Sequence, residues 1–215
     1  RGRTQGPAGR RAAVRGFPDF GAPAGFDDED AFVPAHLPEP GPFLEGHEVL
    51  AGDDHVAVHR VARECFEERR VYDMTFGYNL ARLNRDRRHP DAGFRYAVET
   101  ADPDGDGVAS GLDVAAPAVL RAEFTPTTPF CPQSDTLTVA SFRAWNGLAE
   151  RHDFDLVRVR VAPMHHESEV IDAKLARLEE RFVETGALRE VGESDRAGGG
   201  FDGVDHGDPA EDGPF

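Results

Sequence analysis

Cys131 and its neighbours are the residues whose types and spacing best suit chemistry. Cys131 lies in an uncharged stretch, residues 125–132, which holds prolines at positions 126, 129 and 132. A helix is expected to begin just after this stretch, and the free N–H groups at a helix N-terminus stabilise an anion. A thiolate in such a place has a lowered pKa and can act as a nucleophile or a metal ligand. Cys131 is therefore the candidate reactive thiol, with a small buried cysteine as the alternative.

Two adjacent histidines are the next candidates. His165 and His166 follow the strand that is expected after this helix. Loops that follow neighbouring parallel strands gather at one edge of an open α/β sheet, where sites usually form. We therefore expect Cys131 and His166 to lie on the same rim, with polar residues at a helix start as the alternative reading of the histidines. Cys65 falls on the apolar face of a predicted helix and is expected in the core.

Hydrophobic periodicity predicts the elements that must position these side chains. Helices are expected at 56–70, from about 134 to 152 and from 168 to 186, and strands at 94–100, 118–125 and 155–162. Ser134 and Asp135 are expected to cap the second helix with their side-chain oxygens. This order predicts an α/β (α+β) two-layer sandwich: a small mixed sheet of about three to four strands, with one βαβ crossover and about three helices.

Composition divides the chain into three parts. Residues 1–54 lack a period of 2 or 3.6 and are expected to form a disordered or peripherally docked leader. Residues 55–191 are expected to be the folded domain. Residues 192–215 combine glycines with acidic side chains and are expected to be a disordered tail, because they cannot bury enough apolar surface to offset their ordering entropy.

The charge of the chain excludes some partners. Of its 215 residues, 40 are acidic and 24 basic, and the net charge of −16 is unsuited to binding a phosphate backbone. Lys174 is the only lysine, and this acidic, lysine-poor composition is typical of proteins adapted to high salt. We expect no nucleic acid and, since no apolar run approaches the length of a membrane span, no membrane partner. Two cysteines are too few for a disulfide scaffold, which favours a reducing cytoplasm.

The stretch around Cys131 also resembles a known family. The chain is similar to the iron-sulfur cluster assembly domain family in five features: the segment from Phe124 to Cys131, the helix after it, the strand 157–163, His166 and the closing helix. This family includes SufT-like bacterial proteins, the phenylacetate-pathway PaaD subunit and the eukaryotic cytosolic iron-sulfur assembly targeting factor. The resemblance covers about residues 115–191, in a divergent chain of halophile type. The family's two threonines, proline, reactive cysteine and histidine are matched in this chain by Thr125, Thr127, Pro129, Cys131 and His166. The family's Asp-Pro-Glu is represented only by Asp73, and His165 stands beside the matched histidine, so both are candidates for a supporting shell.

The resemblance implies a non-enzymatic role in the maturation of iron-sulfur proteins. The implied cofactor is a transient iron-sulfur cluster handled through Cys131, and the implied partners are apo iron-sulfur proteins and the assembly machinery. One thiolate cannot complete a cluster's four-cysteine shell, so a homodimer, a second protein or small thiols would have to contribute. Two alternatives stay open: an interaction module that kept the fold and lost the cluster chemistry, and a thiol enzyme with Cys131 as nucleophile and His166 as base.

A third pattern concerns calcium. Asp102, Asp104 and Asp106, followed by Gly107, have the spacing of the first ligands of a calcium-binding loop. Because the flanking residues read as strands, an Asp-Gly hairpin turn is the competing interpretation.

Overall fold

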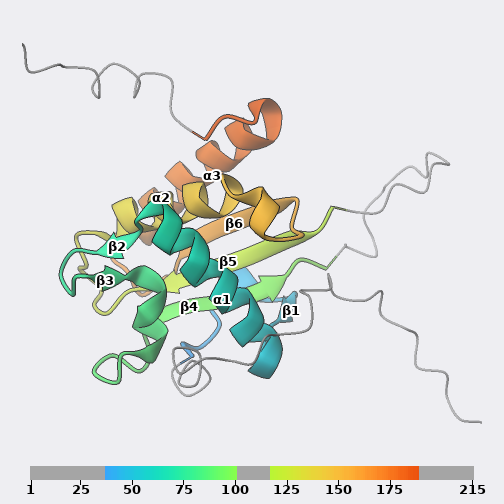
Figure 1. The fold of residues 1–215 in the computed structure, drawn as a ribbon. Coiled ribbons are helices and arrows are strands. Elements are labelled where there is room, and N and C mark those ends of the chain that lie inside the picture. The colour runs from blue at the N-terminus through green and yellow to red at the C-terminus, as the bar shows by residue number, and fades with distance from the viewer. Residues whose placement is uncertain (1–36, 101–116, 189–215) are drawn as a thin grey trace, which may run out of the picture.

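Helices lie against one face of a mixed sheet, as Figure 1 shows. The computed structural model describes residues 37–100 and 117–188. The sheet has the order β1-β4-β5-β6, in which β4 is antiparallel to both of its neighbours and β5 is parallel to β6. Its strands are β1 (Glu48–Val49), β4 (Gly93–Val98), β5 (Val119–Thr125) and β6 (Leu156–Val161). The helices are α1 (Gly52–Arg69), α2 (Ser134–Asn146) and α3 (Ser168–Thr185). The predicted α+β sandwich, with α2 as the crossover, is confirmed.

The sheet buries one face because its strands alternate. Phe94 and Tyr96 of β4 lie in the core with Phe66 of α1 and Trp145 of α2. The rings of Phe66 and Phe94 are 5.4 Å apart, a spacing at which tilted aromatic pairs attract each other. Cys65 is fully buried in this core as expected, and burial raises the pKa of its thiol to about 12. Cys65 is therefore structural, which leaves Cys131 as the accessible cysteine.

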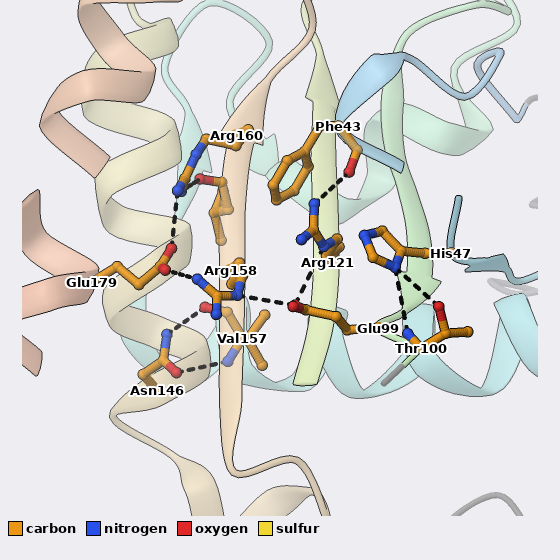
Figure 2. Close-up of polar contacts among 11 residues, drawn as sticks. Phe43, His47, Glu99, Thr100, Arg121, Asn146, Val157, Arg158, Arg160 and Glu179 are labelled. Atoms are coloured by element: carbon orange, nitrogen blue, oxygen red, sulfur yellow. Dashed lines mark hydrogen bonds and ion pairs between the residues drawn. The ribbon is translucent and has the colours of Figure 1, made fainter. Parts of the chain in front are cut away.

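The other face of the sheet holds a chain of ion pairs (Figure 2). Glu99 accepts hydrogen bonds from Arg121 at 3.3 Å and from Arg158 at 3.0 Å. Arg158 also pairs with Glu179 of α3, which accepts a further bond from Arg160 at 3.0 Å. These partly buried pairs join α3 to the arginines of β6, while Ile171, Leu175 and Leu178 of the same helix pack in the core.

The 3₁₀ helix η2 (Pro42–Leu44) packs on this charged face. The Phe43 ring lies 4.8 Å from the Arg121 guanidinium, and the Gly41 N–H donates to the buried carboxylate of Glu123 at 2.7 Å. Burial raises the pKa of Glu123. A Cβ at position 41 would lie 2.6 Å from that carboxylate, so only glycine allows the approach. The segment before residue 55 therefore contributes to the described fold.

Two asparagine amides complete the sheet where strands lack a neighbour. Asn146 accepts from the Val157 N–H at 2.9 Å and donates to the Val157 carbonyl at 2.8 Å, on the open edge of β6 (Figure 2). Asn84 makes the same two bonds with Phe94 of β4, at 2.8 and 2.9 Å. Each side-chain amide thus replaces the peptide group of a missing strand, which satisfies backbone groups and blocks edge pairing.

Several predicted boundaries shift in the structure. The first helix begins at Gly52 rather than residue 56, and β1 precedes it, so the boundary expected at residue 55 falls inside the fold. The second helix ends at Asn146, before the 3₁₀ helix η4 (Ala149–Arg151). The short hairpin of β2 (Tyr72–Asp73) and β3 (Tyr78–Asn79) and the 3₁₀ helix η3 (Leu80–Arg85) were not predicted. Elements this short carry too few residues to show a hydrophobic period.

The predicted cap of α2 is wrong. Gln133 is the residue before the helix, and no side chain there makes a capping hydrogen bond. The hydroxyl of Ser134 is buried and has no hydrogen-bond partner among the described residues. Ser134 and Asp135 are instead the first two residues of the helix.

The fully buried imidazole of His55 makes stability depend on pH. Neither of its ring nitrogens has a hydrogen-bond partner within residues 37–100 and 117–188. Its ring stacks on His59 at 5.7 Å and lies 5.0 Å from Tyr96. Burial, followed by the charges of His59 and Arg95, lowers the pKa of His55 from 6.5 to about 2.

We predict that His55 makes the folded state less stable in mild acid. Below pH 6.5 the unfolded chain binds a proton at His55 that the folded chain excludes, so the free energy of unfolding falls by about 1.4 kcal/mol per pH unit. Above the pKa of His55 in the unfolded chain, 6.5, this loss is absent, and it grows as the pH falls toward the lowered pKa of the folded state. In His55→Phe this slope should disappear, which denaturant titrations between about pH 6 and pH 5 measure; an unchanged slope would contradict the assignment.

A second prediction concerns the edge of β6. Asn146→Leu leaves the Val157 N–H and carbonyl unpaired, at a cost of about 1–3 kcal/mol for each buried group. Urea titration of this variant should show a lower free energy of unfolding. The control Thr136→Leu, at an exposed position of the same helix, should change it by less than about 0.5 kcal/mol. If both substitutions lower the free energy of unfolding equally, the two hydrogen bonds between Asn146 and Val157 do not stabilise the fold as proposed.

Candidate functional site

The candidate site lies where β5 and β6 end. Because the two strands are parallel, the loop after β5, residues 126–133, and the loop after β6, residues 162–167, leave the same edge of the sheet. The N–H of Ala162 donates to the carbonyl of Phe124 at 2.8 Å and so continues the pairing beyond the strands. Cys131 and the two histidines therefore belong to adjacent loops.

The two histidines hold the cysteine loop through its backbone. Buried His165 donates from Nε2 to the Cys131 carbonyl at 3.1 Å, while its Nδ1 accepts from the Glu167 N–H at 3.2 Å. Exposed His166 donates to the Pro129 carbonyl twice, from its backbone N–H at 3.0 Å and from Nδ1 at 2.8 Å. The second bond places the proton of neutral His166 on Nδ1, so its Nε2 carries the lone pair that binds a proton or a metal.

The β2–β3 hairpin approaches the same loop. Asp73 is buried, and its Oδ1 accepts from the Thr75 N–H at 2.7 Å and the Phe76 N–H at 3.2 Å, which forms the turn. Gln133 joins this turn to the start of α2: it accepts from the Met74 N–H at 3.0 Å and donates to the Thr75 hydroxyl at 2.6 Å. Asp73 thus contributes to the site by shaping the hairpin.

The remaining matched loop residues lie between the strand and the thiol. Thr125 is the last residue of β5 and pairs with Gly93 of β4. Thr127 is half-buried in the loop, and Pro129 is exposed. Half-buried Cys131 donates its N–H to the Thr128 carbonyl at 3.3 Å, a turn that fixes the loop just before α2. The thiol is therefore carried by a backbone held at both ends.

Large apolar side chains are exposed on the Cys131 loop, on the loop after β6 and on the β2–β3 hairpin. Phe130, next to Cys131, is 71% exposed, and Met74 at the hairpin tip is 80% exposed. Met164, in the loop after β6, is 42% exposed. The Phe130 ring lies 5.0 Å from that of His166, which joins the two loops. We call Met74, Phe130, Cys131 and Met164 the Cys131 surface.

Sequence reasoning missed Met74, Phe130, Met164 and Gln133. Phe130 and Met164 lie within the segments already singled out, and an apolar residue between prolines and a cysteine is a usable signal of exposure. The role of Gln133 depends on a contact with a hairpin 59 positions away and left no signal in its own segment.

Metal binding at this surface would need ligands from elsewhere. Within residues 37–100 and 117–188, no group of three or more His, Cys, Asp or Glu side chains is arranged to hold a metal ion. Potential ligands that the two loops supply are Cys131, the Nε2 of His166 and the exposed carboxylate of Glu167. Asp102, Asp104 and Asp106, the predicted calcium ligands, lie outside the described residues.

Comparison with known proteins places the chain in a family. The family model described as "Domain of unknown function (DUF7998)" matches residues 24–189. The chain belongs to this family. The matched region includes every described residue, and the acidic residues from position 190 onward lie beyond it. No curated protein and no solved structure matches the chain. Among the helices of the described residues, none is both long and apolar enough to cross a membrane.

We predict that His165 holds the cysteine loop more strongly than His166 does. His165→Phe removes two hydrogen bonds at a buried position and should lower the free energy of unfolding by about 1–3 kcal/mol. Hydrogen exchange at the backbone amides of residues 131, 133 and 134 should become faster. The control His166→Phe removes one bond at an exposed position and should cost less than about 1 kcal/mol. Faster exchange in the control than in His165→Phe would contradict this order.

Proposed function

We propose that this protein is a non-enzymatic factor for the maturation of iron-sulfur proteins, which hands clusters to apo-proteins through Cys131 in the cytoplasm. The observation that carries the proposal is the Cys131 surface: a half-buried cysteine on a loop held by His165 and His166, with exposed Phe130 on this loop and exposed Met164 and Met74 on the two segments hydrogen-bonded to it. The resemblance of this segment to iron-sulfur cluster assembly domains supports it.

The exposed apolar side chains suit a protein partner. Exposed apolar groups that cluster on a soluble domain mark contact sites for other proteins. Methionine is flexible and polarizable, so Met74 and Met164 can adapt to partners of different shape. A factor that serves several apo-proteins needs such a surface beside the group that it offers to them.

The ligands at this surface suit transient handover. Cys131 supplies one thiolate and His166 one imidazole nitrogen, whereas a cluster needs about four protein ligands. The remaining ligands would come from the recipient, the assembly machinery or a second copy of the chain. A cluster held by so few ligands leaves readily, which a carrier requires.

A second candidate is an interaction module without cluster chemistry. The specific observation in its favour is that Asp73, the one residue retained from the family's Asp-Pro-Glu, makes turn hydrogen bonds. In this function the apolar residues bind partners and the thiol of Cys131 is dispensable.

We predict that Cys131 is required for cluster binding. After anaerobic incubation with iron and sulfide, the wild type should gain absorbance near 400 nm, and Cys131→Ala should lose most of it. Cys65→Ala is the matched control, because it removes the other cysteine, which lies in the core. The part of this variant that folds should gain the same absorbance as the wild type. Cells that carry Cys131→Ala should show reduced activity of iron-sulfur enzymes.

The apolar residues separate the two candidates. Phe130→Ser keeps the thiol and should reduce transfer to an apo-ferredoxin several-fold while leaving the reconstituted absorbance unchanged. If Cys131→Ala reconstitutes like the wild type and supports normal enzyme activity, the cluster proposal is wrong. Loss of partner binding in Phe130→Ser alone would then favour the interaction module.

A further inference from the structure

A basic groove lies beside the Cys131 surface. It has a volume of about 550 Å³ and runs between the start of α2 and the exposed side of α3. The carboxylates of Asp135 and Glu167 line it, and so do Val170, Lys174, Arg177 and Arg181 of α3, of which Val170 is the exposed apolar residue. Their spacing of 4, 3 and 4 positions places all four on one side of the helix.

Two acidic residues of α3 contact the sheet and not the groove. Glu179 pairs with Arg158 and Arg160 of β6, as Figure 2 shows. Asp172 accepts from the Val161 N–H of the same strand at 2.9 Å. These two carboxylates are directed to the sheet, so they do not neutralise the cations of the groove.

Of the three cations in the groove, only Lys174 has a carboxylate partner among the described residues. Lys174 pairs with Asp135 at 2.9 Å. Arg177 donates from Nε to the Ala173 carbonyl at 3.0 Å, and Nη1 of Arg181 is buried without a hydrogen-bond partner among the described residues. In the same part of the chain, neither arginine makes an ion pair.

The chain itself contains a segment of complementary charge. Residues 193–212 hold seven acidic residues and one arginine, together with Phe201 and Val204. The acidic residues are Glu193, Asp195, Asp202, Asp205, Asp208, Glu211 and Asp212. The segment follows α3 closely, and its 20 residues reach up to about 66 Å, whereas the 18 residues of α3 span about 27 Å. Tethering also raises its local concentration to the millimolar range.

We propose that this acidic segment, residues 193–212, docks in the basic groove of its own chain. Its carboxylates pair with Lys174, Arg177 and Arg181, and an apolar side chain of the segment packs on Val170. A separate acidic protein would have to displace it from the groove. The proposal does not depend on the cluster function, because it uses no residue of the Cys131 surface.

Carbodiimide coupling tests this docking, because it joins a carboxylate to an amine only at direct contact. Lys174 is the only lysine, so peptide mapping of the full chain reports on one side-chain amine. In dilute monomeric protein we expect crosslinks from Lys174 to carboxylates of residues 193–212. Asp135→Asn, which removes the neighbouring competitor, should raise their yield. The double variant Arg177→Glu and Arg181→Glu should lower it several-fold.

The matched control neutralises another acidic run. Replacing Asp27, Asp28, Glu29 and Asp30 with their amides should leave the Lys174 crosslinks unchanged. Crosslinks only to Asp135, or equally to residues 27–30, would overturn the proposal. Crosslinks found only between two copies, detected by mixing ¹⁵N-labelled and unlabelled protein, would overturn docking within one chain.

Discussion

The parallel pairing of β5 with β6 is the constraint on which the rest of the structure depends. A parallel pair needs a crossover, which α2 provides, and it sends the chain from both strands to the same edge of the sheet. The Cys131 loop and the histidine loop are neighbours for this reason. Had the two strands been antiparallel, these loops would lie at opposite ends of the sheet.

Side-chain hydrogen bonds satisfy the backbone groups where this small sheet ends. The amides of Asn84 and Asn146 take the place of missing strands, and Glu179 of α3 pairs with the arginines of β6. Backbone groups at a sheet edge would otherwise be unpaired or open to other chains. His55 is the contrasting case, because its buried ring nitrogens have no partner among the described residues and its burial lowers the pKa of the imidazole.

The same edge combines a rigid backbone with an accessible side chain. His165 and His166 bind the carbonyls of Cys131 and Pro129, so the histidines hold the loop that carries the half-buried Cys131. Phe130 beside Cys131 in the chain and Met74 on the neighbouring hairpin are exposed apolar side chains. This exposed apolar surface differs from an enclosed pocket of the kind that binds a small substrate.

The sequence by itself determined the six main elements, the fold class and the segment that holds Cys131, because hydrophobic period and proline placement are local properties. It also separated Cys65 from Cys131, since Cys65 lies on an apolar helix face. Tertiary structure decided which groups meet: His165 with Cys131, Gln133 with the turn of Asp73, and Glu179 with the arginines of β6. These contacts join residues 19 to 59 positions apart, and no local pattern encodes the partner at such a separation.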